Sequence, residues 1–226
     1  MEKIIYTLLA SNQFEPADLA AKLRQLGGAK IRINLRDKAV EPAAPLAQQR
    51  GDTLPHAVVQ CWLPTANPAF RAAADDVISE FSSDYHAWLV SEATIIANEM
   101  HIPVGGTRTN GFAQIAFLTL PAGMEWNQWR KIWRDGHTQV AIDTQSNFEY
   151  VQNLVVEPLT DNAPPFVGIV EECFAPEAMT DPQTFFDATD DKEKFTRNLA
   201  AMMASCERFI TAGTIDVFAT SQYDFG

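Results

Sequence analysis

The hydrophobic and polar positions of the chain follow two periods, one typical of strands and one typical of helices. Short apolar runs, several of them alternating with charged residues, predict strands at 3–10, 29–40, 55–64, 85–96, 112–121, 148–159, 164–174 and 214–225. Apolar residues at helical spacing predict helices at 15–28, 67–81, 125–142 and 194–210. Residues 41–54, rich in Pro, Ala and Gln, are expected to form a loop.

The predicted elements run β-α-β-β-α-β twice along the chain. KIIYTLLAS of the first half aligns with AQIAFLTLP of the second, and AVVQCWLP aligns with GIVEECFAP. This indicates an internal duplication, in which Asn34 matches Asn153 and Gln60 matches Glu171. We therefore predict an α+β protein of two tandem ferredoxin-like units with antiparallel sheets, of the dimeric α/β-barrel type. The units are 1–100 and 112–226, joined by a linker at 101–111.

The open face of each predicted sheet is apolar and needs a cover. The two sheets can cover each other within one chain, or a second chain can supply the cover, and the sequence leaves both arrangements open. We expect a homodimer.

Composition and charge exclude several classes of protein. The 226-residue chain has 17 basic and 29 acidic side chains, and it lacks the basic surface that nucleic acids require. Its apolar runs are shorter than the roughly 20 residues of a membrane helix, and its first residues predict a strand rather than a signal peptide. We expect a cytoplasmic protein that binds neither nucleic acid nor membranes.

Metal binding is not expected either. The three cysteines, Cys61, Cys173 and Cys206, form no CxxC pair, which argues against a zinc site and against a disulfide framework. His56 and His101 have no partner at metal-ligand spacing, and His86 at the start of a predicted strand is interpreted as a surface residue.

The predicted helix at 125–142 differs from an ordinary core helix. Trp126, Trp129, Trp133, His137 and Val140 recur at steps of three and four residues, so they are expected on one face. The rings either pack against the sheet or line a ligand cavity, because aromatic side chains serve both purposes. His137 is either a buried neutral histidine or a general acid/base, since an ordinary imidazole titrates near pH ~6.5.

The strands that follow this helix carry further polar residues. Glu171 and Glu172 interrupt an apolar strand, so one carboxylate faces each side of the sheet, and an inward carboxylate needs a partner or a raised pKa. An edge or dimer contact is the alternative. Tyr150 and Asn153 would hydrogen-bond either a polar group of a substrate or neighbouring backbone, and Gly168 would allow a close approach.

Together these residues form a recognisable arrangement: W-x3-W-x3-H in Trp129, Trp133 and His137, Y-V-Q-N at 150–153 and F-x-G-I-V-E at 166–171. It resembles the EthD domain family of dimeric α/β-barrel proteins over 112–225, with 1–100 as a diverged copy. The family usually shows H-G-P at the end of the helix. This chain has Gly136-His137-Thr138 instead, so the helix is expected to run on.

The resemblance implies a cavity between sheet and helices, with Glu171 as the inward carboxylate. Members of the family are associated with degradation of small ethers and dehydration of aromatic polyketides, mostly without a cofactor. We therefore predict a protein that acts on a small apolar or aromatic oxygenated metabolite in a cofactor-free lyase, dehydratase or isomerase step. His137 would transfer the proton. Glu171, Tyr150 and Asn153 would orient the substrate, and Trp129 and Trp133 would form the wall.

Three alternatives stay open. The protein could be a non-catalytic carrier of the same ligands, or a haem-binding α/β-barrel protein with His137 as axial ligand. The duplicated unit could also serve only as an oligomerisation module.

Overall fold

The structure, a computed structural model, describes residues 1–11, 14–51 and 53–226. The first half contains strands β1 (Glu2–Ser11), β2 (Ala29–Leu35), β3 (Ala57–Leu63) and β4 (Ser82–Ile96), with helices α1 (Pro16–Gln25) and α2 (Pro68–Phe81). The second half contains strands β5 (Phe112–Thr119), β6 (Glu149–Pro158), β7 (Phe166–Phe174) and β8 (Asp216–Asp224), with helices α3 (Trp126–Lys131), α4 (Thr138–Thr144), α5 (Pro182–Phe185) and α6 (Lys192–Cys206). The predicted strands and long helices are all present near their expected positions.

Two short 3-10 helices were not predicted, and the predicted helix at 125–142 contains a segment of different winding. A 3-10 helix, η1 (Lys38–Leu46), occupies part of the stretch expected to be a loop, and the Asp37 carboxylate caps it by accepting a hydrogen bond from the Ala39 amide at 3.0 Å. A π-helix, η2 (Ile132–His137), joins α3 to α4, and a 3-10 helix, η3 (Pro176–Met179), follows β7. Pro42 and Pro45 within η1 explain the error, because proline at these positions is more typical of turns.

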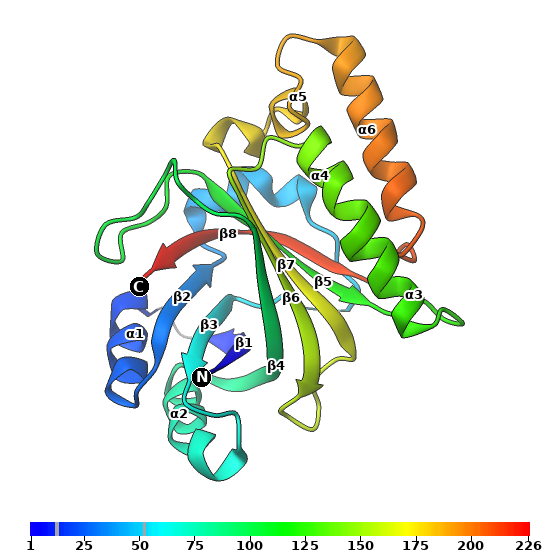
Figure 1. Ribbon diagram of the computed structural model, residues 1–226. Coiled ribbons are helices and arrows are strands. Elements are labelled where there is room, and N and C mark those ends of the chain that lie inside the picture. Colours follow the sequence, from blue (N-terminus) through cyan, green and yellow to red (C-terminus); the bar gives the residue numbers. More distant parts are fainter. Residues whose placement is uncertain (12–13, 52) are drawn as a thin grey trace.

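The eight strands form one closed antiparallel barrel in the order β1-β3-β2-β8-β5-β7-β6-β4. Each half supplies four strands, and the halves join where β2 pairs with β8 and β4 pairs with β6. Strand β4 is long enough to pair with β1 near its start and with β6 near its end. The two sheets therefore complete one barrel within a single chain, which answers the question that the sequence left open (Figure 1).

The interior of the barrel is divided into an apolar and a polar part. The apolar part is a cluster that includes Ile5, Val58, Trp88, Ile115, Phe117 and Phe218. In the polar part, Gln60 of β3 donates a hydrogen bond to Glu171 of β7 at 2.8 Å. Since β3 and β7 are not neighbours in the barrel, this bond crosses the interior and holds the two halves together.

Helices cover the barrel on two sides (Figure 1). Leu19 and Leu23 of α1 and Ile78 of α2 pack on the outer face of the first-half strands. The helix from α3 to α4, together with α6, covers the second-half strands with Trp129, Trp133 and Met202. Within the described residues, no helix combines the length and apolar character needed to cross a membrane.

Candidate functional site

The helix that carries the tryptophans and His137 changes its winding in the middle. The Thr138 amide donates to the carbonyl oxygen of Trp133, five residues earlier, which is the hydrogen bond of a π-helix. The helix then continues through α4, as expected from the absence of a Gly-Pro turn after His137. Single π-turns inside α-helices are frequent at functional sites, because they displace one side chain from the regular helical face.

The three tryptophans do not share one environment. Trp126 is the first residue of α3 and is 37% exposed, with the Arg130 guanidinium 5.7 Å from its ring centre. The expectation that Trp126 lies on the buried face is therefore wrong, since the first turn extends beyond the barrel surface. Trp129 and Trp133 are fully buried, with their ring centres 4.9 Å apart.

Both buried indoles lie on Gly168 of β7. A Cβ atom at this position would be 2.9 Å from Cη2 of Trp133 and 3.0 Å from Cη2 of Trp129. The glycine therefore allows the close approach that the sequence suggested. The Trp129 Nε1–H donates to the carbonyl oxygen of Phe209 at 3.1 Å, so this side chain holds the helix to the segment after α6.

His137 is enclosed between its own helix and α6. Its Nδ1 atom lies 3.0 Å from the Ser205 hydroxyl, and its ring centre lies 4.7 Å from that of Phe209. Burial, reinforced by the positive charge of Arg208, lowers the pKa of His137 to about 4. The imidazole is consequently neutral at neutral pH, and one of its nitrogens carries a proton that it can donate in a hydrogen bond.

A cavity of about 260 Å³ opens beside His137, between the outer face of the barrel and helices η2, α5 and α6. Its walls are mainly apolar and aromatic, with contributions from Trp133, Tyr150, Phe185, Phe209, Met202 and Val217. The volume is slightly below the ~300–1,000 Å³ of pockets that take drug-sized ligands. It suits a small molecule.

Glu172 of β7 contributes the second titratable group of this cavity. Burial raises the pKa of Glu172 to about 7, against the opposing effect of a 2.8 Å hydrogen bond from the Asn147 amide to Oε1. The carboxyl group is thus close to half protonated at neutral pH, and it can either give or take a proton there.

Two glutamines add polar atoms to the same walls, Gln114 and Gln145. Gln145 is 9% exposed, and among the described residues its Oε1 atom has no hydrogen-bond partner. A buried amide oxygen without a partner is unfavourable, so a ligand with a hydroxyl or amino hydrogen would be stabilised at this point.

The residues predicted for the site separate into two groups. Trp133, His137 and the ring of Tyr150 line the cavity, and the Tyr150 hydroxyl accepts a hydrogen bond from Gln152 Nε2 at 2.8 Å. Burial raises the pKa of Tyr150, which therefore stays protonated. Trp129 supports the cavity wall from behind through its contact with Trp133.

Glu171 and Asn153 lie on the other side of the barrel wall, in the polar interior. Glu171 accepts a hydrogen bond from Asn34 at 2.7 Å and forms an ion pair with Arg32 at 3.0 Å. Asn153 accepts a hydrogen bond from the Lys3 ammonium group at 2.8 Å. Neither side chain shares the cavity with His137.

Glu172 is the site residue that sequence reasoning did not select. A strand places alternate residues on one face, so Gly168, Val170 and Glu172 share the face that meets the tryptophan helix. The same rule separates Tyr150 from Asn153, since residues three positions apart in a strand face opposite sides of the sheet. Gly168 lies beneath the indoles, so Glu172, four positions later on the same face of β7, is expected to face the same helix.

The corresponding position of the first half, where its own helices meet its strands, is occupied by apolar side chains. Leu19, Leu23 and Ile78 fill that position with a closed core, and the Tyr6 hydroxyl donates to Asp75 at 3.0 Å. Among the described residues, no group of three or more His, Cys, Asp or Glu side chains is arranged to bind a metal ion.

Residues 121–212 match the model of the EthD domain family. This match confirms the resemblance seen in Trp129, Trp133, His137 and the strands after them, and it covers part of the second half of the chain. A crystal structure described as an anthrone oxidase-like protein is similar to the whole chain, with a TM-score of 0.51, 11% sequence identity, and coverage of 100% of this chain and 94% of that chain. This likeness confirms the predicted fold class.

A second solved structure, a putative monooxygenase from Lactobacillus acidophilus NCFM, gives a TM-score of 0.44 and 7% identity, with coverage of 98% of this chain and 92% of that chain. No curated protein sequence matches the chain.

Proposed function

We propose that the cavity beside His137 binds a small apolar or aromatic oxygenated molecule and catalyses a proton transfer on it without a cofactor. The observation that carries this proposal is the pairing of a neutral imidazole with a carboxyl group of pKa about 7 in one apolar cavity. Neighbouring titratable groups with pKa values moved in opposite directions are typical of acid/base sites.

In this reaction, the Glu172 carboxylate removes a proton from a carbon next to a carbonyl group. The neutral His137 donates a hydrogen bond to the carbonyl oxygen, which becomes the enolate oxygen, and Ser205 fixes the ring through Nδ1. Return of the proton to a different carbon gives an isomer. Loss of a neighbouring hydroxyl group as water gives a dehydration. The two outcomes share the first step and differ in the substrate.

His137 was predicted to transfer the proton itself. The low pKa of its imidazole favours a different assignment of the general base. A base with a pKa near 4 accepts a proton from carbon poorly, whereas a carboxylate with a pKa near 7 is matched to neutral pH. Glu172 therefore takes the role of general base, and His137 polarises the oxygen. A proton-transfer role for Glu171 is not part of this proposal, because its carboxylate is paired inside the barrel.

The test uses 1-indanone as probe, a small aromatic ketone with exchangeable hydrogens next to its carbonyl group. The protein is incubated with 1-indanone in heavy water, and NMR measures binding and the exchange of these hydrogens for deuterium. We expect exchange to accelerate as pH rises through about 7. Glu172→Gln should reduce the rate by ~10²-fold or more, as for loss of a general base.

Glu157→Gln is the matched control, because Glu157 is an exposed glutamate on the adjacent strand β6. Binding of 1-indanone without accelerated exchange would favour the carrier alternative. A protein that neither binds the probe nor accelerates its exchange would contradict the proposal.

A further inference from the structure

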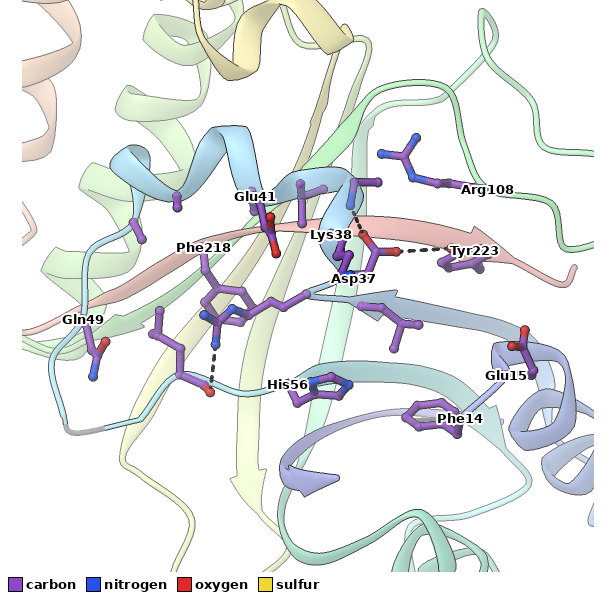
Figure 2. Close-up of a pocket in the computed structure, with 18 of the residues that line it drawn as sticks. Phe14, Glu15, Asp37, Lys38, Glu41, Gln49, His56, Arg108, Phe218 and Tyr223 are labelled. Carbon is purple, nitrogen blue, oxygen red and sulfur yellow. Dashed lines mark hydrogen bonds between the residues drawn. The ribbon is translucent and has the colours of Figure 1, made fainter. Parts of the chain in front are cut away.

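A second and larger cavity lies beside η1, and the proposed reaction does not use it. This cleft has a volume of about 1140 Å³ and is formed by segments far apart in the sequence. The ends of β2 and β8, helix η1, the start of α1 and the residues before β3 surround it (Figure 2). We call it the η1 cleft.

Three basic side chains line the η1 cleft: Arg36, Lys38 and Arg108. Within residues 1–11, 14–51 and 53–226, none of them has a carboxylate within ion-pair distance, whereas Lys3, Lys22, Arg32, Arg50, Arg71 and Lys194 all do. The positive charge of Arg36, Lys38 and Arg108 is available to a ligand.

Contacts with backbone carbonyl groups and with an aromatic ring hold the Arg36 side chain in place. Its Nη1 atom donates to the carbonyl oxygens of Leu54 at 3.1 Å and Pro55 at 3.3 Å, and its guanidinium carbon lies 5.8 Å from the ring centre of Phe218. These contacts fix one edge of the guanidinium plane. A fixed guanidinium binds a carboxylate more favourably than a mobile one, because less side-chain entropy is lost.

Arg108 is fixed in a similar way at another point of the cleft. Its Nε atom donates to the Ser221 hydroxyl at 2.7 Å, and its Nη2 atom donates to the Gly111 carbonyl oxygen at 2.7 Å. The nearby Asp37 carboxylate is already occupied by the Ala39 amide, the Ser221 hydroxyl at 2.8 Å and the Tyr223 hydroxyl at 3.4 Å. Asp37 is thus part of the wall of the cleft.

The other acidic residues of the cleft restrict the kind of anion. Glu15, Asp18 and Glu41 are exposed side chains that also line it. These carboxylates would repel a ligand with several negative charges, such as a nucleotide. A ligand with a single carboxylate can place that charge next to Arg36, where the attraction to the guanidinium is strongest. The remaining walls are largely apolar, with Phe14, Leu35, Val40, Leu54 and Phe218 among them.

We propose that the η1 cleft is a second binding site, which takes an organic monocarboxylate with an apolar body. The carboxylate pairs with Arg36, the apolar body lies against the aliphatic and aromatic wall, and Lys38 and Arg108 add positive charge. This site is separate from the cavity beside His137, and it stands whether or not that cavity is catalytic.

The test measures the affinity of benzoate, benzyl alcohol and ATP by isothermal titration calorimetry, at low and at physiological ionic strength. We expect benzoate to bind best and to weaken with salt. Benzyl alcohol has the same ring without the charge, and ATP is the polyanion that the acidic residues should repel. Arg36→Gln should weaken benzoate binding by about tenfold or more, which corresponds to the loss of one charge-assisted hydrogen-bond pair.

Two further variants and two controls make the result specific. Lys38→Gln changes an exposed side chain and should weaken benzoate binding less than Arg36→Gln, without affecting the fold. Arg108→Gln should also weaken it. Arg24→Gln, at an exposed arginine of α1 outside the cleft, and His137→Gln, in the other cavity, should leave benzoate affinity unchanged. The proposal fails if benzoate does not bind, if ATP binds as well as benzoate, or if Arg36→Gln leaves the affinity for benzoate unchanged.

Discussion

Glu171 and Glu172 are adjacent residues of β7, and their carboxyl groups lie on opposite sides of the barrel wall with opposite pKa changes. Burial would raise the pKa of both. At Glu171 the positive charge of Arg32 and hydrogen bonds from three amide side chains outweigh burial, so its pKa is well below the usual range. At Glu172 burial prevails over the single hydrogen bond from Asn147, and the pKa rises to about 7. Strand β7 thus supplies the charged carboxylate of Glu171 to the barrel interior and the titrating carboxyl group of Glu172 to the cavity.

Glu172→Gln should remove a pH dependence of stability. The folded-state pKa of Glu172 is about 7, above its usual value of 4.5, so its neutral form is favoured by folding. This contribution is fully present below pH 4.5 and is lost as pH rises through about 7. Between pH 5 and pH 8 the native protein should therefore lose about 2 kcal/mol of unfolding free energy relative to the variant.

Urea unfolding of both proteins at the two pH values measures this difference. Glu157→Gln, an exposed glutamate on β6, is the control and should follow the native protein. Parallel pH dependence of the native protein and Glu172→Gln would show that the carboxyl group has an ordinary pKa.

His137 should produce the complementary effect in acid. Burial and Arg208 lower its pKa from 6.5 to about 4, so the unfolded chain binds a proton at this residue more readily than the folded protein does. Stability from the neutral imidazole is present above pH 6.5 and is lost as pH falls through about 4. We expect a loss of about 2 kcal/mol between pH 7 and pH 4 that is absent in His137→Gln.

The pKa itself can be measured by an NMR titration of the His137 ring protons in the native protein. The resonances should stay constant from pH 8 to about pH 5 and shift only below that. A midpoint near 6.5 would contradict the burial of the imidazole. His86 is the internal reference, since its pKa is lowered less strongly by burial.

The sequence predicted the elements of this fold well, because each is specified by its own residues. The alternation of Ile31, Ile33 and Leu35 identifies β2, and the spacing of Trp129 and Trp133 identifies the helix. The closure of the barrel was not predictable in the same way. It depends on pairing between β2 and β8 and between β4 and β6, which are contacts between residues distant in the sequence.

Only the part of the candidate site that depends on local sequence patterns was predictable. The environment of His137 follows from local helical spacing, and this residue does line the cavity. Its low pKa depends first on burial and then on the charge of Arg208, more than 60 residues later, and no local pattern places these two residues together. The η1 cleft is the extreme case, since Phe14, Arg36, Arg108 and Phe218 come from four separate parts of the chain.

Gly168→Ala should disturb the helix that carries His137. The added Cβ atom would lie 2.9 Å from Trp133 and 3.0 Å from Trp129, and two packed indoles cannot easily move away. We expect a loss of about 1–3 kcal/mol of unfolding free energy, as for other overpacked cores. Thermal unfolding measures it, with Gly51→Ala as the control because nothing lies within 4 Å of a Cβ atom there. A Gly168→Ala protein as stable as the control would show that the indoles are loosely packed.

Arg32→Met should destabilise the protein more at neutral than at acidic pH. The Arg32 guanidinium forms ion pairs with Glu149 at 2.8 Å, Glu171 at 3.0 Å and Asp224 at 2.7 Å, and its removal leaves buried carboxylates without their cation. Loss of one partner of a buried ion pair typically costs about 3–5 kcal/mol, because the remaining charge is uncompensated. As pH falls, Glu171 without its cation can take up a proton and become neutral, so the difference from the native protein should shrink.

Urea unfolding at pH 7 and pH 4.5 measures this change, and Arg24→Met is the control because Arg24 is exposed on α1 and outside the barrel. Glu171→Gln should be less harmful than Arg32→Met, since Arg32 keeps two of its carboxylates. Arg32→Met and Glu171→Gln should also leave the exchange rate of 1-indanone unchanged in protein that remains folded. A loss of exchange in folded Glu171→Gln, with normal exchange in Glu172→Gln, would move the proton-transfer role from the cavity to the barrel interior.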